Sequence, residues 1–360
     1  MEKLIFIPAY KPDGRLTELC RKLSGTYSVL VVDDGSGKDF DAVFESTADF
    51  ATVLRYEKNR GKGGALKYGF SKIPELFPDA DYIITADADG QHTPEDIAKV
   101  AERVKETGGL VLGSRKFTGK VPARSAFGNT LTRFVFKVAS GASVRDTQTG
   151  LRAFGKEYLE RFSTLKGDRY EYEMTQLMYC AAEKIPMTEV DIETIYENDN
   201  ETSHFNPLKD SFKIYKVIYL NSTFLKFITS SVVAFLIDFL LYLFLTNAVF
   251  TKEYLVETPE FFKNLLTSAS VSMVLAWIVS SFVNFLLNRN WAFRSDKRFI
   301  TAMAEYYSLA IVSMLIKAFV ITPLLKLMHI PNVLTYLIAN VAMYVINYVV
   351  QKKFIFKKKD

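Results

Sequence analysis

The chain has 360 residues and a formal net charge of +5, and its two cysteines exclude a disulfide framework and a cysteine-based zinc site. Its length allows two domains. A mean hydropathy of +0.07 averages two different halves, because residues before about 220 have a soluble α/β pattern and those after it are strongly apolar. The excess positive charge flanks apolar stretches, so membrane headgroups are its expected partner rather than nucleic acid.

Five short runs rich in β-branched and apolar residues predict strands in the first half of the chain. They are 4–7, 29–32, 52–56, 82–86 and 109–113. Helical patterns separate them, and this alternation is typical of βαβ units in a mostly parallel sheet. Each run ends in a polar, glycine-rich or acidic loop. Because ligands bind beyond the carboxyl ends of such strands, one crevice is expected to collect the chemistry.

Two carboxylates, Asp87 and Asp89, follow the fourth predicted strand. Alternate side chains of an extended backbone share a face, so both are expected to point the same way. Paired hard oxygen ligands suit Mg²⁺ or Mn²⁺ carrying a diphosphate, and Gln91 can add a neutral oxygen. The alternative is that the two acids merely end the strand. The next helix has its own predicted capping box, Thr93 with Asp96, which leaves them for a metal.

The segment between Arg115 and Arg152 mixes cations with aromatic residues. Helical periodicity over 125–140, with an apolar and a cationic face, predicts a helix in the membrane interface. Arg115 and Arg124 are the predicted ligands of a lipid phosphate, because a guanidinium fork matches phosphate oxygens. Arg133 either joins them or faces lipid headgroups. Nucleic-acid binding is the competing interpretation, and the apolar second half of the chain argues against it.

The second half predicts a membrane domain. Cations and large apolar residues alternate over 207–220, which predicts an amphipathic linker helix, with a solvated linker as the alternative. Four apolar stretches follow, each near or above the roughly 20 residues that cross a bilayer. They are 224–249, 265–288, 305–327 and 332–351. A buried helical bundle in a soluble protein is the alternative, but these stretches are apolar on all sides.

Cations follow the second and fourth apolar stretches: Arg289, Arg294, Lys297, Arg298, Lys352, Lys353, Lys357, Lys358 and Lys359. The other connections, near 251–264 and 328–331, hold few, so the positive-inside rule predicts that both termini are cytoplasmic. No secretory leader is expected, because a strand pattern starts almost at Met1. The N-terminal domain is therefore expected in the cytoplasm, where nucleotide-activated substrates occur.

An internal repeat is visible in the membrane half. Residues 284–293 are echoed by 347–356, with an asparagine, an amide, a cation, an aromatic residue and a phenylalanine in register. This predicts two duplicated helical hairpins. Asp238 and Lys317 are the ionisable residues deep within the predicted spans. Such groups are costly in lipid, so they are interpreted as a structural pair or as participants in lipid handling.

Several motifs stand in the order seen in family 2 glycosyltransferases of the GT-A fold, which the chain resembles. They are Ile7-Pro8-Ala9-Tyr10, Val31-Val32-Asp33-Asp34-Gly35-Ser36, Asn59-Arg60-Gly61-Lys62-Gly63, Asp87-Ala88-Asp89-Gly90-Gln91-His92 and Gly113-Ser114-Arg115. Thr149-Gly150-Leu151-Arg152 and Ser203-His204-Phe205 make residues 1–215 most similar to the polyprenyl-phosphate glycosyltransferases. Residues 224–357, with Asp238, resemble the GtrA-like membrane domain. One departure is Lys11-Pro12-Asp13, where the family usually has an acid directly after Pro-x-Tyr.

The resemblance implies a fold and a domain order. It implies an α/β GT-A domain, Rossmann-like with a mostly parallel sheet, over 1–205. An amphipathic interfacial helix would follow over 206–222, and an all-α transmembrane domain of four helices in two repeated hairpins over 223–360. Some GtrA-like domains are thought to help move lipid-linked sugars, and for this chain that is a hypothesis.

The resemblance also implies roles for individual residues. Asp33 would accept from a base N–H or a ribose hydroxyl, with Asp13 replacing the missing acid one turn later. Lys62 would provide countercharge in a glycine-rich turn that is not a P-loop. The predicted nucleotide site is Pro8, Ala9, Tyr10, Asp33, Asp34, Lys62, Gly63 and Asp87. The predicted acceptor loop contains Gln148, Thr149 and Arg152, and the predicted catalytic residues are Asp87, Asp89 and Arg115.

The implied function is inverting transfer of a sugar from a nucleotide diphosphate sugar, such as UDP-glucose, to polyprenyl phosphate for cell-envelope glycosylation. A lipid phosphate is anionic at neutral pH, its second pKa being about 6, so no general base is required. His92 and His204 are accordingly interpreted as structural. The implied partners are the donor, the lipid acceptor, Mg²⁺ or Mn²⁺ and membrane lipids, with a homo-oligomer left open.

Three alternatives remain at this stage. The first is a lipid-sugar flippase or membrane scaffold with a vestigial transferase domain, although the intact Asp87 and Asp89 argue against it. The second is a GDP-mannose-dependent mannose synthase. The third is a processive polysaccharide synthase, but neither Trp277 nor Trp291 lies in the Gln-x-x-Arg-Trp signature of those enzymes.

Overall fold

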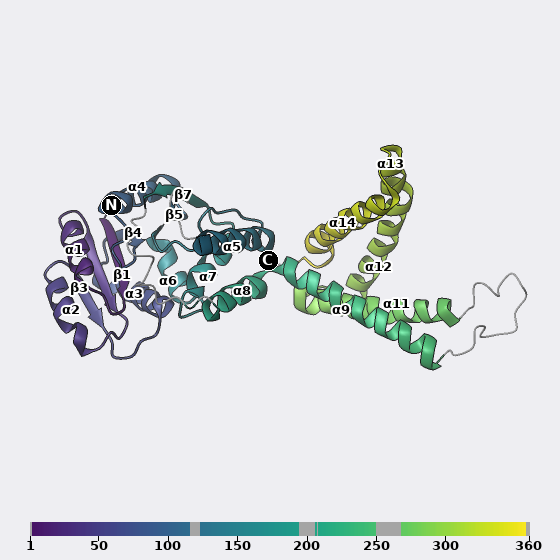
Figure 1. Ribbon diagram of the computed structural model, residues 1–360, viewed down its shortest axis with the longest axis horizontal. Coiled ribbons are helices and arrows are strands. Elements are labelled where there is room, and N and C mark those ends of the chain that lie inside the picture. The colour runs from purple at the N-terminus through teal and green to yellow at the C-terminus, as the bar shows by residue number, and fades with distance from the viewer. Residues whose placement is uncertain (1, 116–122, 194–205, 207, 250–267, 358–360) are drawn as a thin grey trace, which may run out of the picture. The chain divides into compact units, whose positions relative to one another are not determined.

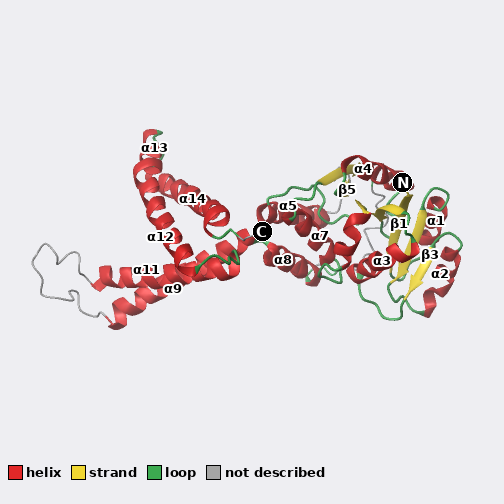
Figure 2. Cartoon of the chain, turned by 180° about the vertical axis from the view of Figure 1, so that it is seen from behind, coloured by secondary structure: helices red, strands yellow, loops and turns green. Residues whose placement is uncertain are grey.

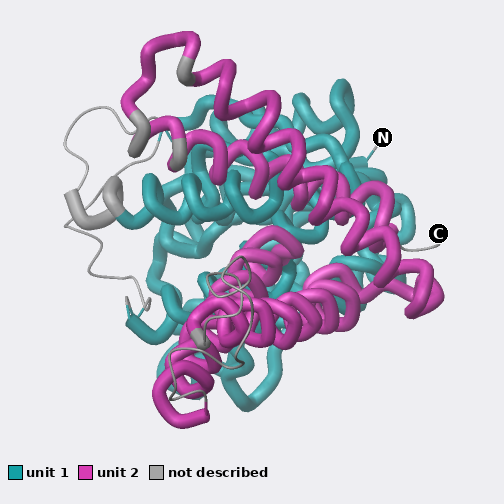
Figure 3. Tube along the Cα trace, turned by 90° about the vertical axis from the view of Figure 1, so that its right-hand side faces the viewer, with its two compact units in different colours: residues 1–221 teal, residues 222–360 magenta. Residues whose placement is uncertain are grey.

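The computed structural model describes the chain apart from residues 1, 116–122, 194–205, 207, 250–267 and 358–360 (Figure 1). The chain divides into two compact units, Met1–Asn221 and Ser222–Asp360 (Figure 3). The first contains all the described strands together with helices, and the described elements of the second are helical (Figure 2). The predicted α/β domain and helical domain are thus both present.

Unit 1 is built on a seven-stranded sheet with the strand order β3-β2-β1-β4-β6-β5-β7. Its strands are β1 (Glu2–Ala9), β2 (Ser28–Asp33), β3 (Thr52–Arg55), β4 (Ala80–Thr85), β5 (Leu110–Arg115), β6 (Arg152–Gly155) and β7 (Met187–Ile192). All pairs are parallel except those of β6, which runs antiparallel to β4 and β5. The five predicted strands form. The sequence analysis missed β6, which has four residues, and β7, where polar residues interrupt the apolar pattern.

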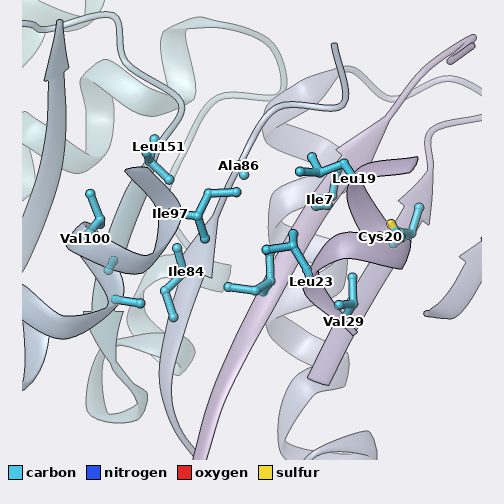
Figure 4. Close-up of a cluster of buried hydrophobic side chains, with 14 of the residues drawn as sticks. Ile7, Leu19, Cys20, Leu23, Val29, Ile84, Ala86, Ile97, Val100 and Leu151 are labelled. Carbon is cyan, nitrogen blue, oxygen red and sulfur yellow. The ribbon is translucent and has the colours of Figure 1, made fainter. Parts of the chain in front are cut away.

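Helices pack on the sheet and extend beyond its β5 side. They are α1 (Gly14–Leu23), α2 (Asp41–Ala48), α3 (Lys62–Leu76), α4 (Pro94–Thr107), α5 (Ala123–Ser140), α6 (Leu159–Ser163), α7 (Glu171–Ala182) and α8 (Lys209–Asn221). One core cluster joins Ile7 and Ile84 of the sheet to Leu19 of α1 and Ile97 of α4 (Figure 4). Burial of each such side chain stabilises the fold by about 1.5–3 kcal/mol, and it fixes the strands whose ends carry the site.

The capping box predicted before α4 forms only in part. Thr93 Oγ1 accepts from the backbone N–H of Asp96 at 3.1 Å, as predicted. The Asp96 carboxylate does not close the box, because it accepts instead from Lys99 Nζ at 2.8 Å and from the backbone N–H of Glu193 at 2.9 Å. Asp96 therefore ties α4 to the end of β7, and the carboxylates of the preceding turn take no part in capping the helix.

Unit 2 consists of long helices that end in π-helical turns. The helices are α9 (Thr223–Phe244), α11 (Ser268–Leu287), α12 (Phe299–Ile316), α13 (Thr322–Leu327) and α14 (Asn332–Val350). The π-helical turns are η4 (Leu245–Val249), η5 (Asn288–Ala292), η6 (Lys317–Ile321) and η7 (Gln351–Ile355).

Three stretches, Thr223–Val249, Ala269–Ala292 and Phe299–Leu325, are long and apolar enough to span a membrane. They match the first three predicted spans, although the third begins at Phe299 rather than at 305 and the predicted start of the second, 265, lies outside the described residues. The fourth predicted span, 332–351, coincides with α14 and stays a prediction as a span.

The repeat predicted from the sequence has a structural counterpart. Asn288 and Gln351, at equivalent positions of the two copies, each begin a π-helical turn, and Asn288 Nδ2 donates to Gln351 Oε1 at 3.2 Å. The equivalent rings of Phe293 and Phe356 stack with centroids 5.2 Å apart. Contact between equivalent residues is what a two-fold relation produces. The two copies of the repeat therefore meet about a local pseudo-two-fold axis.

Candidate active site

The sheet order places the predicted site at one edge. Parallel strands β1, β2 and β4 end together, and the chain leaves β1 toward β2 on one side while β4 lies on the other. Such a switch point opens a crevice at the carboxyl ends of the strands. Tyr10, Asp34 and Asp87 follow these three strands directly or within one residue.

Asp87 is held by a lysine that bridges two carboxylates. Lys62 Nζ, from the first residue of α3, lies 2.6 Å from Asp87 Oδ1 and 2.8 Å from Glu173 Oε1 of α7. Burial opposes the charge of Lys62, but the two carboxylates outweigh it and raise the pKa of Lys62. Burial likewise opposes the charge of Asp87, and Lys62 with His92 outweighs it and lowers the pKa of that carboxyl. The sequence analysis assigned Lys62 to the nucleotide and missed Glu173.

Asp89 lies on a tight turn after Asp87. The backbone N–H of Gln91 donates to Asp89 Oδ1 at 3.0 Å, and Gly90 has a φ of +74°, a conformation that favours glycine. Burial and the nearby Asp87 raise the pKa of Asp89. Two carboxylates brought together in this way repel each other, so a divalent cation would relieve a strain that is already present.

The donor set fits a hard divalent ion that keeps open positions. Asp87, Asp89 and the Gln91 amide would provide at most three protein oxygens, and diphosphate oxygens and water would complete the sphere. Within the described ranges, no cluster of three or more His, Cys, Asp or Glu side chains forms a closed metal cage. His92 is buried with Nε2 3.5 Å from Asp87 Oδ2, too far for a good hydrogen bond, and its structural role stays a prediction.

The predicted acceptor loop lies directly against Asp87. A Cβ added at Gly150 would be 2.4 Å from Asp87 Oδ2, so only glycine fits there without displacement. Thr85 Oγ1, at the end of β4, donates to the carbonyl of Gly150 at 2.9 Å. The structure thus brings together two motifs that are some sixty residues apart in the sequence, and it places the acceptor loop beside the candidate metal site.

Arg115 is fixed next to this loop by a two-pronged ion pair. Its Nε lies 2.6 Å and its Nη2 3.0 Å from the two carboxylate oxygens of Asp146, which is fully buried. Asp146 Oδ1 also accepts from the backbone N–H of Gln148 at 3.0 Å. Of the other predicted phosphate ligands, Arg133 is exposed on α5, and Arg124 lies in the first turn of α5 with a side chain outside the described part.

Arg152, the last residue of the predicted acceptor loop, is enclosed by the protein. It is 2% exposed and donates to the carbonyls of Thr149 and Glu173 and to Gln176 Oε1 at 2.8–3.0 Å. A guanidinium enclosed in this way cannot reach a lipid headgroup. Arg152 therefore connects the predicted acceptor loop to α7 through buried hydrogen bonds. His204 and its neighbours in the Ser203–Phe205 motif lie outside the described residues.

The predicted nucleotide side has one carboxylate that is fully engaged. Asp34 Oδ1 accepts from Tyr56 and from the backbone N–H of Arg60, and its Oδ2 accepts from Asn59, at 2.6–2.9 Å. Asp34 therefore joins the loops after β2 and β3, and its contact with the nucleotide stays a prediction. Asp33 accepts from Ser36 N at 2.8 Å and from Arg55 Nε at 2.9 Å.

The remaining predicted nucleotide residues border the same edge. Pro8 and Tyr10 are partly exposed around the buried Ala9 at the end of β1. Asp13 caps α1 and forms an ion pair with Arg15 at 2.8 Å. This structural role explains an acidic residue at position 13 without a contact to the nucleotide. Gly63 is a close-packing residue, because a Cβ there would lie 2.5 Å from Tyr172 Cβ.

Glu173 carries a weak signal in the sequence. It is an acidic residue within the otherwise largely apolar helical run Tyr172–Ala182, at a position where a helix buries its side chain. The pattern alone does not indicate which cation it meets, since Lys62 lies more than a hundred residues earlier.

Two family models match the chain: Glycosyl transferase family 2 over residues 4–162 and GtrA/DPMS, transmembrane domain, over residues 226–356. A UDP-N-acetylglucosamine–dolichyl-phosphate N-acetylglucosaminyltransferase of Methanococcus voltae is 33% identical over 220 residues, which cover 54% of this chain and 87% of that protein. The dolichyl-phosphate beta-glucosyltransferase of Homo sapiens is 30% identical over 217 residues, covering 52% and 65%.

A polyprenol monophosphomannose synthase of Mycolicibacterium smegmatis is 29% identical over 188 residues, covering 47% of this chain and 67% of that protein. Among solved structures, a glucosyl-3-phosphoglycerate synthase from Mycobacterium tuberculosis, in complex with Mn²⁺ and UDP, has a TM-score of 0.49 at 15% identity, covering 61% of this chain and 80% of that one. The relative from Methanococcus voltae and the two family models together show that the chain belongs to the family 2 glycosyltransferases, among the relatives of the dolichyl- and polyprenyl-phosphate enzymes, and that it carries a GtrA/DPMS transmembrane domain.

Proposed function

We propose that this chain transfers a sugar from a UDP-sugar, with UDP-glucose as the first candidate, to a polyprenyl phosphate, with inversion at the anomeric carbon. The observation that carries the proposal is the contact between the acceptor loop and the Asp87–Asp89 turn, where Gly150 lies against the Asp87 carboxylate. A nucleotide bound at the strand edge and an acceptor bound at the loop would then meet over one carboxylate pair.

The reaction forms a bond between an oxygen of the lipid phosphate and the anomeric carbon, and it breaks the bond from that carbon to the nucleoside diphosphate. The lipid phosphate is already ionised at neutral pH, so no side chain has to remove a proton. The larger task is to stabilise the departing diphosphate. Asp87 and Asp89 would hold a divalent cation, which would supply that charge. Lys62, held by Glu173, adds a fixed positive charge beside it.

Arg115 is the proposed ligand of the acceptor phosphate. Its ion pair with Asp146 fixes the guanidinium beside the loop that contacts Asp87. A preoriented guanidinium binds phosphate at a smaller entropic cost than a mobile one. Arg124 and Arg133, both on α5, are proposed to attract the lipid headgroup from the membrane surface.

The choice of a UDP-sugar is supported by two relatives. One is named for UDP-N-acetylglucosamine, and another is named as a glucosyltransferase. Because another relative is named as a polyprenol monophosphomannose synthase, GDP-mannose is the alternative donor against which UDP-glucose should be compared. Asp33 is the proposed acceptor for a base N–H, and the partly exposed Pro8 and Tyr10 are proposed to flank the base.

The chain is a membrane protein by its GtrA/DPMS domain and its apolar helices. We further propose that the catalytic unit faces the cytoplasm. The cations Arg289, Arg294, Lys297 and Arg298 follow the second span, and cytoplasmic connections carry such an excess.

The test is transfer of label from UDP-[¹⁴C]glucose, and separately from GDP-[¹⁴C]mannose, to polyprenyl phosphate in vesicles with Mn²⁺ or Mg²⁺. Asp89→Asn is expected to lower the rate about 100-fold or more, because it removes an anionic ligand without changing shape. EDTA is expected to abolish labelling and added Mn²⁺ to restore it. Glu95→Gln, on the exposed first turn of α4, is the matched control. Full activity of Asp89→Asn would refute the metal role.

A further inference from the structure

Helix α5 has one face turned outward and one face attached to the acceptor loop. On the outer face Leu131, Phe134 and Val138 are 42%, 63% and 38% exposed, and the cations Arg133 and Lys137 are exposed beside them. Large apolar side chains next to cations are typical of a helix at a membrane surface. The helix packs beside α7 and α8 (Figure 1).

The inner face carries a buried asparagine that joins the helix to the loop. Asn129 is 3% exposed. Its Oδ1 accepts from the backbone N–H of Thr147 at 3.3 Å and from Thr147 Oγ1 at 3.1 Å, and its Nδ2 donates to the carbonyl of Arg145 at 3.0 Å. The side-chain amide of Asn129 therefore bonds to the two residues that flank Asp146, the partner of Arg115.

The loop itself is held to the sheet without the help of α5. Glu189 of β7 accepts from the backbone N–H of Arg145 at 2.7 Å and of Asp146 at 3.3 Å. Asp146 is paired with Arg115 at the end of β5. These contacts hold the loop on the sheet, so the Asn129 contacts attach α5 to a loop that is also fixed from the other side. They therefore help to set the place of α5 relative to Asp87.

We propose that Asn129 is a positioning residue. It fixes the distance between the outer, lipid-facing side of α5 and the loop beside Asp87, so that a phosphate anchored in the membrane lies at the same depth as Arg115. The proposal rests on the proposed function, because it assumes a polyprenyl phosphate acceptor. A phosphate anchored in the bilayer cannot adjust its height, whereas a water-soluble one can. Loss of the Asn129 contacts would therefore affect anchored acceptors most.

The experiment compares two acceptors with the full-length protein in vesicles: long-chain polyprenyl phosphate in the bilayer and a short, water-soluble prenyl phosphate. Asn129→Ala is expected to raise the KM for the long-chain acceptor about tenfold. The KM for the UDP-sugar and the KM for the soluble acceptor are expected to change less than about twofold. Asn129→Ser keeps a polar group without adding a charge, but its hydroxyl is too short for both loop contacts and can bond within the helix, so a similar selective effect is expected.

Two variants separate positioning from general damage. Thr132→Val removes a different buried polar group of α5, a hydroxyl that contacts the Gly128 carbonyl and Tyr215 of α8 rather than the loop. This variant is expected to leave the KM for both acceptors unchanged. Glu189→Gln loosens the loop itself and is expected to impair both acceptors alike. If Asn129→Ala does not fold, Asn129→Ser provides the same comparison.

The outcomes are distinct. An equal loss for both acceptors, or a long-chain KM unchanged in both Asn129 variants, overturns the positioning role while leaving the proposed function intact. Wild-type protein that labels neither prenyl phosphate overturns the proposed function and this inference with it. A selective loss for the bilayer acceptor supports both.

Discussion

At the residue scale, the candidate site contains charges that already compensate one another. Lys62 lies between Asp87 and Glu173 with both contacts under 3 Å. Asp89, in contrast, accepts from the backbone N–H of Gln91. A metal that binds Asp87 and Asp89 must therefore share Asp87 with Lys62, and Glu173 decides how strongly Lys62 remains attached to Asp87.

The first residue-scale prediction concerns Glu173→Gln. The variant removes one of the two carboxylates around Lys62, so the ammonium is left to Asp87 alone and competes more strongly with the metal. The apparent affinity for Mn²⁺ is expected to fall about tenfold, with a similar loss of activity. Activity titrated against Mn²⁺ concentration measures this effect. Glu183→Gln, exposed after the end of α7, is the control, and an unchanged Mn²⁺ dependence in Glu173→Gln would contradict the prediction.

The second prediction compares two glycines. In Gly150→Ala the new Cβ would lie 2.4 Å from Asp87 Oδ2, and Asp87 is restrained by Lys62. Overpacking of this kind costs about 1–3 kcal/mol, and the activity is expected to fall with it. Gly128→Ala is the control, because its Cβ meets nothing within 4 Å and alanine is favoured within a helix by about 1 kcal/mol.

Thermal unfolding and transfer assays of the two alanine variants provide the measurement. Gly128→Ala is expected to unfold at a slightly higher temperature with normal activity. Equal behaviour of the two variants would show that the Gly150–Asp87 contact is not tight in solution.

At the element scale, two π-helical turns of unit 2, η5 and η7, begin with amide residues that bond to each other. Asn288 is fully buried and contacts Ser230 of α9, Asn284 of α11 and Gln351 of η7. Around it the rings of Phe285, Phe293 and Phe356 form the core of the unit. Removing one member of a polar cluster inside an aromatic core destabilises the protein, because the remaining polar groups stay buried without a hydrogen-bond partner.

Elsewhere in unit 2, each deep ionisable residue is bonded within its own helix pair. Asp238 Oδ1 accepts from Ser280 of α11 at 2.8 Å, and Lys317 Nζ donates to Asn340 of α14 at 2.7 Å. These bonds give each group a local polar partner, which lowers the cost of a charge at membrane depth. Their role in handling lipid stays a prediction.

The prediction at this scale is that Gln351→Ala destabilises unit 2 by about 1 kcal/mol and that Asn288→Ala destabilises it by more. Both variants remove the same inter-repeat hydrogen bond, but Asn288→Ala also removes the contacts with Ser230 and Asn284. Unfolding in mixed micelles with increasing SDS measures the change. Asn290→Ala, exposed two residues after Asn288, is the matched control. A large effect of Asn288→Ala with none for Gln351→Ala would contradict the pseudo-two-fold arrangement.

At the scale of the whole molecule, the two units have separate cores. The cluster around Ile7, Ile84 and Ile97 lies within unit 1, and the aromatic cluster around Phe285 lies within unit 2. The described candidate site residues, from Pro8 to Glu173, belong to unit 1. With 221 residues, unit 1 is large enough to form a stable core by itself.

The prediction is that a chain truncated after Asn221 folds and binds nucleotide. It is expected to unfold cooperatively, and UDP with Mn²⁺ is expected to raise its Tm, because ligand binding to the native state alone stabilises it. It is also expected to bind vesicles, since Phe212 and Leu208 are 69% and 84% exposed on or next to α8. A truncated chain that unfolds without cooperativity would show that unit 1 depends on unit 2.

Much of the architecture is local in origin, and the sequence by itself determined it. Apolar runs with β-branched residues set five strands, a lone Thr93 caps α4, and continuous apolar stretches set the helices of unit 2. The Asp87–Asp89 pair was identifiable as two acids directly after a predicted strand, although the strand ends at Thr85 and Asp89 lies on a turn rather than on an extended chain. The repeat could be read because duplicated segments keep their amides and aromatic residues in register.

Only the tertiary structure decided which partner each buried charge has. Asp34 became a bridge between loops, Arg152 a brace and Glu173 a partner of Lys62, although residue type alone favoured ligand contacts for Asp34 and Arg152. The physical reason is that a buried charge is stabilised by whichever donors the fold brings within about 3 Å, and these lie tens of residues away in the chain. Local patterns specify strands and helices, whereas the pairing of charges depends on their packing.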